Sequence, residues 1–257
     1  MKIVVIPDLH QAPNLDQLEQ AIAREHPDLT VFLGDYFDQY GDSPSDAGRT
    51  AEWLQHSLRQ PKRIHLWGNH DLPYCYPKNP VVRCPGFTIE KLEAIQNHLG
   101  ETDRQKFQLY HWEGHRLFSH AGWSKHWFNP QFAEADPRSN LAIRELEAWE
   151  ALRAQRDHWI FGCGIRRGGR VWAGGLIWCD IREFEPIPGI NQFFGHTPGT
   201  LGKHVSGDRS NNWCLDTTDR AGLHHYLVIN GDRVDVCRID GSPEPGFRFP
   251  TTTRAEV

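Results

Sequence analysis

The sequence has few features of a protein stabilised by zinc or by disulfides. None of its six cysteines belongs to a C-x-x-C pair; they are Cys75, Cys84, Cys163, Cys179, Cys214 and Cys237. This spacing argues against a structural zinc site. Several of the cysteines lie in apolar runs, which is typical of buried free thiols, and a reducing compartment fits them best.

The sequence also lacks a long hydrophobic run and an excess of basic residues. The N-terminal stretch MKIVVIPDLH has one lysine and a short apolar run before Asp8. It is too short for a secretory signal or a membrane span, so we expect a cytoplasmic protein without membrane contact. Lys and Arg number 28 against 33 Asp and Glu, a net charge of −5. This charge argues against general duplex nucleic-acid binding, but it is compatible with a nucleotide substrate.

The first third of the chain alternates short apolar strands with helices. Lys2–Ile6, Thr30–Leu33 and Arg63–Trp67 are short and apolar, as buried strands are. Between them, a helix is expected after the Asn14 cap, and another from Pro44 to Leu58 after the Ser43 cap. This alternation predicts parallel β-α-β units.

The pattern changes after the third strand. We expect a helix over Thr88–Leu99 closed by Gly100, and a hairpin of Gln108–Trp112 and Arg116–Ser119. A long helix is expected over Ser139–Arg156, and four residues should face inward: Leu141, Leu146, Trp149 and Leu152. Later strands are predicted at 192–194, 213–215, 223–229 and 233–239, and Trp53, Trp149 and Trp172 are interpreted as packing residues.

Polar side chains of the kind that bind metals follow five of the apolar strands. The residues are Asp8 and His10, Asp35 and Asp38, Asn69 and His70, His120, and His196. Each motif alone is more typical of a turn or of a surface histidine. In open α/β sheets, however, ligands bind at the carboxyl ends of strands, and all five motifs occupy that position. Their combination therefore predicts one shared site.

The order of these motifs resembles that of a known family. The motifs D-x-H, G-D-x-x-D, G-N-H-D, S-H-A-G and G-H-T-P run in this order through residues 8 to 198. The sequence is similar to the calcineurin-like metallophosphoesterases, and most similar to the branch of the Ser/Thr protein phosphatases and symmetrical diadenosine tetraphosphatases. Leu176–Asp180 and Cys214–Thr217 resemble two further segments of that branch. The resemblance implies an α/β fold in which two mixed β-sheets pack as a sandwich flanked by helices.

The resemblance also implies a domain organisation. Residues 1–241 would form the metallophosphoesterase domain, with a helical insertion at about 123–160. Residues 242–257, which are rich in Pro, Gly and Thr, would be a loosely ordered tail.

The resemblance assigns a role to each motif residue. Asp8 and His10 would bind a first metal ion, and Asp35 would bridge both ions. Three residues would bind the second ion: Asn69, His120 and His196. His70 would donate a proton to the leaving group, oriented by Asp38. The implied cofactors are two divalent ions, with Mn as first choice and Fe, Zn, Co or Ni as alternatives.

The chain departs from the branch at several positions. Gln39 and Trp67 stand where the protein phosphatases have arginines, Asp71 replaces a glutamate, and Gln11 replaces a glycine. The first of those arginines grips the substrate phosphate, so another cation must replace it here. The loop with Arg166, Arg167 and Arg170 is the candidate, and a surface loop with solvated charges is an equally good interpretation.

Three functions are compatible with these motifs. The first is a dinuclear metal-dependent phosphatase that hydrolyses a phosphomonoester by attack of a metal-bridging water. The second is a hydrolase of dinucleoside polyphosphates, or of other nucleotide or nucleic-acid phosphates. The third is a binding module that keeps the fold without catalysis. The partner is in each case a phosphorylated molecule, and the filled motif positions favour an enzyme.

Overall fold

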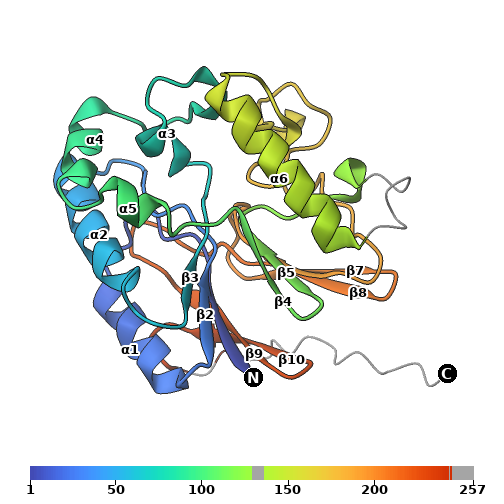
Figure 1. Ribbon diagram of the computed structural model, residues 1–257. Coiled ribbons are helices and arrows are strands. Elements are labelled where there is room, and N and C mark those ends of the chain that lie inside the picture. Colours follow the sequence, from blue (N-terminus) through green and yellow to red (C-terminus); the bar gives the residue numbers. More distant parts are fainter. Residues whose placement is uncertain (129–135, 243, 245–257) are drawn as a thin grey trace.

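Strand β1 (Lys2–Ile6) forms the centre of the first sheet. The computed structural model describes residues 1–128, 136–242 and 244. In the strand order β10-β9-β1-β2-β3, β1 is parallel to β2 (Leu29–Phe32), which is parallel to β3 (Arg63–His65). On its other side β1 pairs antiparallel with β9 (His225–Asn230), which forms a hairpin with β10 (Arg233–Arg238) (Figure 1).

The second sheet also has five strands, in the order β4-β5-β6-β8-β7. Its parallel centre consists of β5 (Arg116–Ser119), β6 (Asn191–Phe194) and β8 (Ser210–Cys214). The edge strands β4 (Tyr110–Glu113) and β7 (Lys203–Gly207) are antiparallel to their neighbours. The sequence analysis did not predict β7, because its residues KHVSG are polar and half exposed.

The two sheets pack face to face through alternating side chains. Ile3 and Val5 of β1 face the second sheet, where they join a buried cluster with Phe118 and Phe193. Val4 and Ile6 point to the opposite face, toward the helices. Burying each such side chain stabilises the fold by about 1.5–3 kcal/mol. The predicted fold class, two mixed sheets flanked by helices, is confirmed.

Helices α1 (Leu15–Glu25) and α2 (Pro44–Ser57) cover the outer face of the first sheet (Figure 1). Ser43 begins α2 with a capping box, as predicted, because its hydroxyl accepts from Asp46 N and the Asp46 carboxylate accepts from Ser43 N. Asn14 precedes α1, but its side chain makes no cap bond. Its amide nitrogen instead donates to Leu223 O, and its amide oxygen accepts from Leu223 N.

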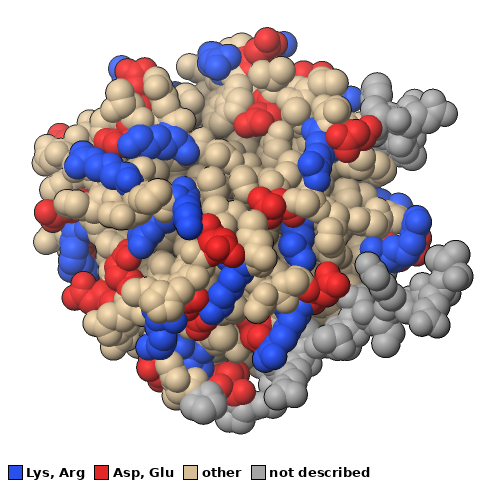
Figure 2. Space-filling model, turned by 60° about the horizontal axis from the view of Figure 1, so that its bottom comes forward, with Lys and Arg blue, Asp and Glu red and all other residues tan. Residues whose placement is uncertain are grey.

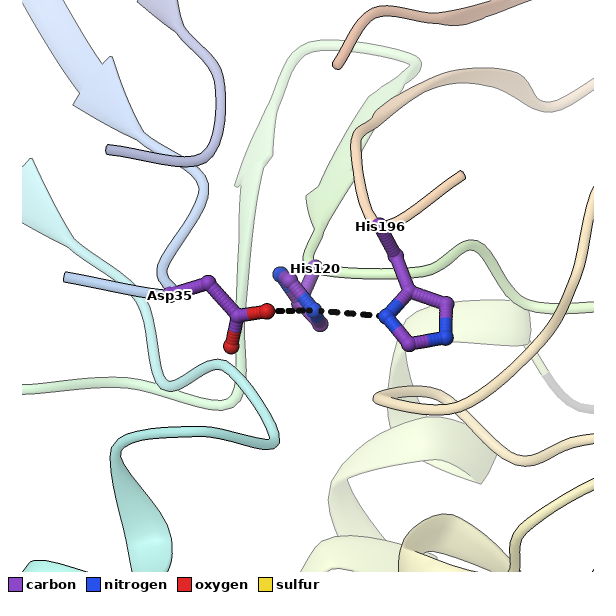
Figure 3. A group of neighbouring side chains, drawn as sticks. All are labelled: Asp35, His120 and His196. Carbon is purple, nitrogen blue, oxygen red and sulfur yellow. Dashed lines mark hydrogen bonds and ion pairs between the residues drawn. The ribbon is translucent and has the colours of Figure 1, made fainter. Parts of the chain in front are cut away.

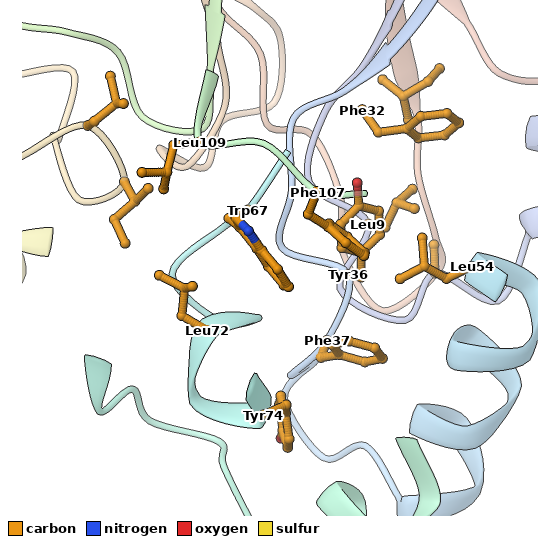
Figure 4. Close-up of a cluster of buried hydrophobic side chains, with 14 of the residues drawn as sticks. Leu9, Phe32, Tyr36, Phe37, Leu54, Trp67, Leu72, Tyr74, Phe107 and Leu109 are labelled. Atoms are coloured by element: carbon orange, nitrogen blue, oxygen red, sulfur yellow. The ribbon is translucent and has the colours of Figure 1, made fainter. Parts of the chain in front are cut away.

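Two shorter helices follow on the same side. Thr88 caps α4 (Ile89–Gln96), while Gly100 begins α5 (Glu101–Arg104), so the prediction that Gly100 closes the preceding helix is wrong. Between them and the sheet lies an aromatic cluster in which the Trp67 ring stacks on Phe107 at 4.2 Å between centroids (Figure 4). Trp67 is therefore a core residue. It belongs to the same buried cluster as Leu72 of the short helix α3 (Leu72–Cys75).

Helix α6 (Pro137–Arg153) lies on the side of the second sheet (Figure 1). Leu141 and Leu152 are buried as predicted, but Leu146 is 67% exposed. Five residues along a helix rotate a side chain by about 140°, which turns Leu146 away from the face of Leu141. Trp172 is 76% exposed, so its interpretation as a packing residue is also wrong. Trp149 is partly buried against the core.

The remaining described elements are short 3₁₀ turns at Pro80–Val82, Lys125–Trp127, Trp159–Phe161 and Ile165–Arg167. The predicted loose tail at 242–257 lies almost entirely outside the described residues. On the face shown in Figure 2, acidic and basic side chains are interspersed rather than gathered by sign. Among the described residues, no helix has the length and apolar character needed to cross a membrane.

Candidate metal centre

The predicted ligands converge where the strand ends of the two sheets meet. Asp8, Asp35 and Asn69 follow β1, β2 and β3 of the first sheet, while His120 and His196 follow β5 and β6 of the second. His10 lies two residues beyond Asp8. All are buried except His10, which is intermediate. The sandwich therefore brings residues that are far apart in sequence to one seam.

The backbone at this seam is strained. Four of the predicted functional residues have left-handed φ angles: His10 (43°), Asp35 (49°), Asp38 (67°) and His196 (68°). Such conformations cost about 1–3 kcal/mol each in non-glycine residues and cluster at functional sites. Surrounding hydrogen bonds hold them in place, including those from Leu9 N and His10 N to Asp35 O at 3.0 and 2.8 Å.

The first group of possible ligands consists of Asp8, His10 and Asp35, whose ligand atoms lie within 4.8 Å of one another. The His10 Nδ1 atom lies 3.0 Å from Phe37 O, so it carries the ring proton and donates to that carbonyl. The Nε2 lone pair is then free, 3.6 Å from Asp35 Oδ2. A carbonyl that fixes the tautomer in this way is characteristic of metal-binding histidines.

The second group consists of Asp35, His120 and His196, again within 4.8 Å (Figure 3). His120 Nδ1 lies 2.9 Å from Leu33 O, which leaves its Nε2 as the ligand atom. That Nε2 lies 2.9 Å from Asn69 Oδ1, 3.1 Å from His196 Nδ1 and 3.4 Å from Asp35 Oδ2. Asp35 belongs to both groups, which is the arrangement that two ions with a shared ligand require.

The electrostatics of these groups fit bound cations. Burial and the Asp216 carboxylate raise the pKa of Asp8 well above its ordinary value. Burial lowers the pKa of His120, but the charges of Asp35 and Asp8 outweigh it and raise that pKa to about 9. A proton or a cation must therefore occupy the space between these acceptors. Two divalent ions bound here would carry four positive charges and Asp8 and Asp35 would return two, so a neutral Asn69 ligand would keep the centre cationic.

Asp71 organises the loops beneath the centre, a role that the sequence did not reveal. Its carboxylate accepts three backbone N–H groups, from Asp35, Tyr36 and Gly68, at 2.8–2.9 Å. Glycine at position 68 leaves room for the Asp35 side chain, because a Cβ atom there would lie 2.1 Å from Asp35 Oδ1. Burial and the Asp35 charge raise the pKa of Asp71 to about 7. Asp71 thus fixes the position of Asp35.

His70 and Asp38 form the predicted pair at the edge of the centre. His70 Nδ1 lies 3.1 Å from Asp38 Oδ2, and its side chain is 20% exposed. Two further residues contact Asp38, Tyr74 and Lys91, and the sequence motifs predicted a role for neither. The thiol of Cys84 lies 3.4 Å from His70 Nδ1.

The three arginines of the predicted substrate loop have different surroundings. Arg167 donates from Nη2 to His196 O at 2.5 Å, and its Nε lies 3.1 Å from Asp180 Oδ2. Arg167 and Arg170 line a cavity of about 630 Å³. Arg166 is exposed and does not line it. The substrate-binding role of Arg166, Arg167 and Arg170 stays a prediction, and two of the three residues line this cavity.

The same cavity has an aromatic wall. Its lining includes Trp127, Trp159 and Trp178, together with Arg83 and Asp157. Trp127 and Trp159 stack at 5.3 Å between centroids, and the Trp178 ring meets the His196 ring edge to face at 5.4 Å. The Trp178 side chain thus lies between the cavity and the predicted metal ligand His196.

A smaller cavity of about 300 Å³ lies beside Gln39, where the missing arginine would be. Gln11, Arg49 and Arg220 also line it. The Arg220 guanidinium lies over the Tyr40 ring at 4.6 Å from its centroid. Arg220 was not predicted as a site residue, although it lies only three residues beyond the Cys214–Thr217 segment.

A sandwich of two mixed sheets with Asp, His and Asn side chains at its strand ends fits the class of phosphoesterases. The family model described as calcineurin-like phosphoesterase matches residues 1–199. The chain belongs to this family of phosphoester hydrolases, which confirms the resemblance of its motifs and its prediction as an enzyme. No curated protein matches the sequence.

Solved structures of phosphatases have a similar fold. The chain is similar to a cold-active protein-tyrosine phosphatase of a psychrophile, Shewanella sp., with 14% identity over 95% of this chain and 79% of that one (TM-score 0.58). It is also similar to a protein serine/threonine phosphatase from Saccharomyces cerevisiae with similarity to human phosphatase PP5. That match has 11% identity over 96% of this chain and 82% of that one (TM-score 0.50).

Proposed function

We propose that the protein is a dinuclear metal-dependent phosphatase that hydrolyses a phosphomonoester by attack of a water held between the ions. One observation carries the proposal: Asp35 is shared by two groups of possible ligand atoms, and the atoms of each group lie within 4.8 Å of one another. Asp8 and His10 would complete the first site, and Asn69, His120 and His196 the second. Bound there, two divalent ions would attract the phosphate and lower the pKa of the attacking water.

His70 is the proposed proton donor. Its Nδ1 is bonded to Asp38, so its Nε2 is the atom that gives a proton to the leaving oxygen as the P–O bond breaks. Asp38 orients the ring and stabilises its charged form. A half-buried position suits this role, because the ring must reach a substrate that enters from solvent.

The aromatic cavity favours a second candidate, hydrolysis of a nucleotide or dinucleoside polyphosphate. Tryptophan rings can stack on a base, and Arg167 and Arg170 can bind a further phosphate. A volume of about 630 Å³ is within the usual range for ligand pockets. A non-catalytic binding module would not need an ordered His70–Asp38 pair, so that alternative has the least support.

Metal stoichiometry tests the proposal directly. We expect about two ions per chain after loading with Mn²⁺, and loss of phosphatase activity on chelation. Asp35→Asn should weaken both sites, whereas Asp208→Asn, at an exposed carboxylate, should change neither. One ion or none per wild-type chain would contradict the dinuclear proposal. Fe, Zn, Co and Ni are compared in the same assay, because N and O ligands suit all of them.

Leaving-group dependence tests the role of His70. An alkyl phosphate leaves as a strongly basic alkoxide, whereas nitrophenolate leaves almost unaided. His70→Asn should therefore lower kcat on an alkyl phosphate by about 10²–10⁴-fold and on nitrophenyl phosphate far less. Equal losses on both substrates would show that His70 positions the phosphate and that the acid is another group. A panel of phosphotyrosine, phosphoserine, dinucleotide and nucleic-acid 3′-phosphate substrates then identifies the class.

A further inference from the structure

Lys91 is a buried lysine close to the proposed proton donor. It lies in the first turn of α4, where its backbone N donates to the Thr88 hydroxyl. Only 3% of the residue is exposed. Lysine is almost never buried to this extent unless its charge is paired, so its partners indicate why it is there.

The ammonium of Lys91 binds two aspartates. Nζ lies 2.6 Å from Asp38 Oδ1, and 3.2 and 3.0 Å from the two oxygens of Asp42. Burial lowers the pKa of Lys91, but the hydrogen bonds to Asp38 and Asp42 outweigh it and raise that pKa above its ordinary value. The group is therefore a fixed cation at neutral pH, and the carboxylates of Asp38 and Asp42 share its single positive charge.

The two oxygens of Asp38 have different partners. Oδ1 accepts from Lys91 Nζ and from the Tyr74 hydroxyl at 2.5 Å, while Oδ2 faces His70 Nδ1. Gly86, at φ +98°, packs against the same carboxylate, since a Cβ atom there would lie 2.7 Å from Asp38 Cγ. The carboxylate is thus held on every side except the one that faces His70.

Lys91 does not take the place of the missing arginine as a phosphate ligand. Its side chain is 4% exposed, and its N–H groups are directed at Asp38 and Asp42. A substrate phosphate cannot reach it without breaking these pairs. Any effect of Lys91 on the reaction must therefore act through the aspartates that it binds, and of these two Asp38 is the one that contacts His70.

We propose that Lys91 is a positioning residue for phosphoester hydrolysis: with Tyr74, it fixes Oδ1 of Asp38 so that Oδ2 holds the His70 ring with Nε2 toward the leaving oxygen. The inference rests on the proposed function. In the step concerned, the water oxygen bonds to phosphorus and the bond to the leaving oxygen breaks. The leaving oxygen takes the His70 Nε2 proton, the water releases its proton to solvent, and His70 regains a proton from solvent.

The test compares Lys91→Met, which keeps most of the chain length without the charge, with Lys91→Arg. In the Mn²⁺-loaded enzyme, Lys91→Met should lower kcat on an alkyl phosphate at least about tenfold more than on nitrophenyl phosphate, with KM little changed. Lys91→Arg should restore most of the difference. Lys106→Met removes an exposed lysine charge and should leave both substrates unaffected.

A second variant guards against misfolding. Lys91→Met alone leaves the carboxylates of both Asp38 and Asp42 without their cation. Combining it with Asp42→Asn removes one positive and one negative charge, so that Asp42 is no longer a second unpaired carboxylate. A crystal structure of either variant should show the His70–Asp38 contact lengthened from 3.1 Å or the His70 ring disordered.

The results separate this inference from the proposed function. Equal losses on both substrates, or an unchanged His70–Asp38 contact in the variants, would overturn the role of Lys91. If His70→Asn keeps the activity of the wild type on alkyl phosphates, that result would instead refute the proposed proton donor. In that case the crystallographic contact still decides whether Lys91 positions the Asp38–His70 pair.

Discussion

The buried imidazole of His65 should make the protein sensitive to mild acid. His65 lies in β3, is 1% exposed, and stacks on Phe32 at 4.4 Å between centroids. Its ring nitrogens contact the hydroxyls of Tyr36 and Ser57. Burial, assisted by the Arg63 charge, lowers the pKa of His65 from 6.5 to about 3. The folded protein therefore keeps this ring neutral where the unfolded chain would charge it.

The sign and size of the effect follow from proton linkage. Below pH 6.5 the unfolded chain binds a proton that the folded protein excludes, so stability falls with the pH until about pH 3. Between pH 6.5 and 5 there are about 1.5 pH units, each worth about 1.36 kcal/mol. The free energy of unfolding should therefore fall by about 2 kcal/mol by pH 5 through this residue alone.

Urea denaturation at pH 8 and pH 5, in chelator so that metal release does not contribute, measures the effect. His65→Gln keeps hydrogen-bonding capacity but does not titrate, and it should be less stable than the wild type at pH 8. The stability difference should shrink by about 2 kcal/mol at pH 5. A difference that is independent of pH would refute the reasoning and would mean that the folded protein accommodates the charged ring.

Two other predictions concern residues around the centre. Arg167→Ala and Arg170→Ala should each raise KM about 10- to 100-fold if a charge-assisted bond to substrate of about 1.5–3 kcal/mol is lost, while Arg166→Ala should not. Equal KM values for the three variants in a steady-state assay would indicate that the loop is a surface loop with solvated charges and does not bind substrate. Asp71→Asn removes an acceptor for buried backbone N–H groups, so it should destabilise the fold by about 1–3 kcal/mol and weaken Mn²⁺ binding. Unfolding and metal titration that match the wild type would show that Asp71 does not support Asp35.

The convergence of the predicted ligands at one seam could be anticipated from where they stand in the sequence. Asp8, Asp35 and Asn69 each interrupt the chain just after an apolar strand, where a polar side chain serves no packing purpose. The alternation of strands and helices predicted parallel β-α-β units, whereas the two-sheet fold class was implied by the resemblance of the motifs. The motifs also placed His70 next to Asp38, a contact that the structure shows at 3.1 Å.

The positions that escaped prediction depend on tertiary contacts. Lys91 has the sequence setting of a surface lysine in a helix, and only its pairing with Asp38 and Asp42 explains its burial. Strand β7 has no apolar run, because it lies at the edge of its sheet. Leu146 is a different case, because its five-residue spacing from Leu141 already places it on another face of α6, where it is exposed.

The strand order of the first sheet has a consequence for how the protein folds. Its central strand β1 needs β9 as a neighbour, and the register pairs Ile3 with Ile229. A contact between residues this far apart forms late, because the chain must close a very long loop first. During synthesis, Asp8 therefore follows a strand that stays unpaired on one edge until β9 emerges. We expect a chain cut off before β9 to hold every proposed ligand and still fail to form the centre.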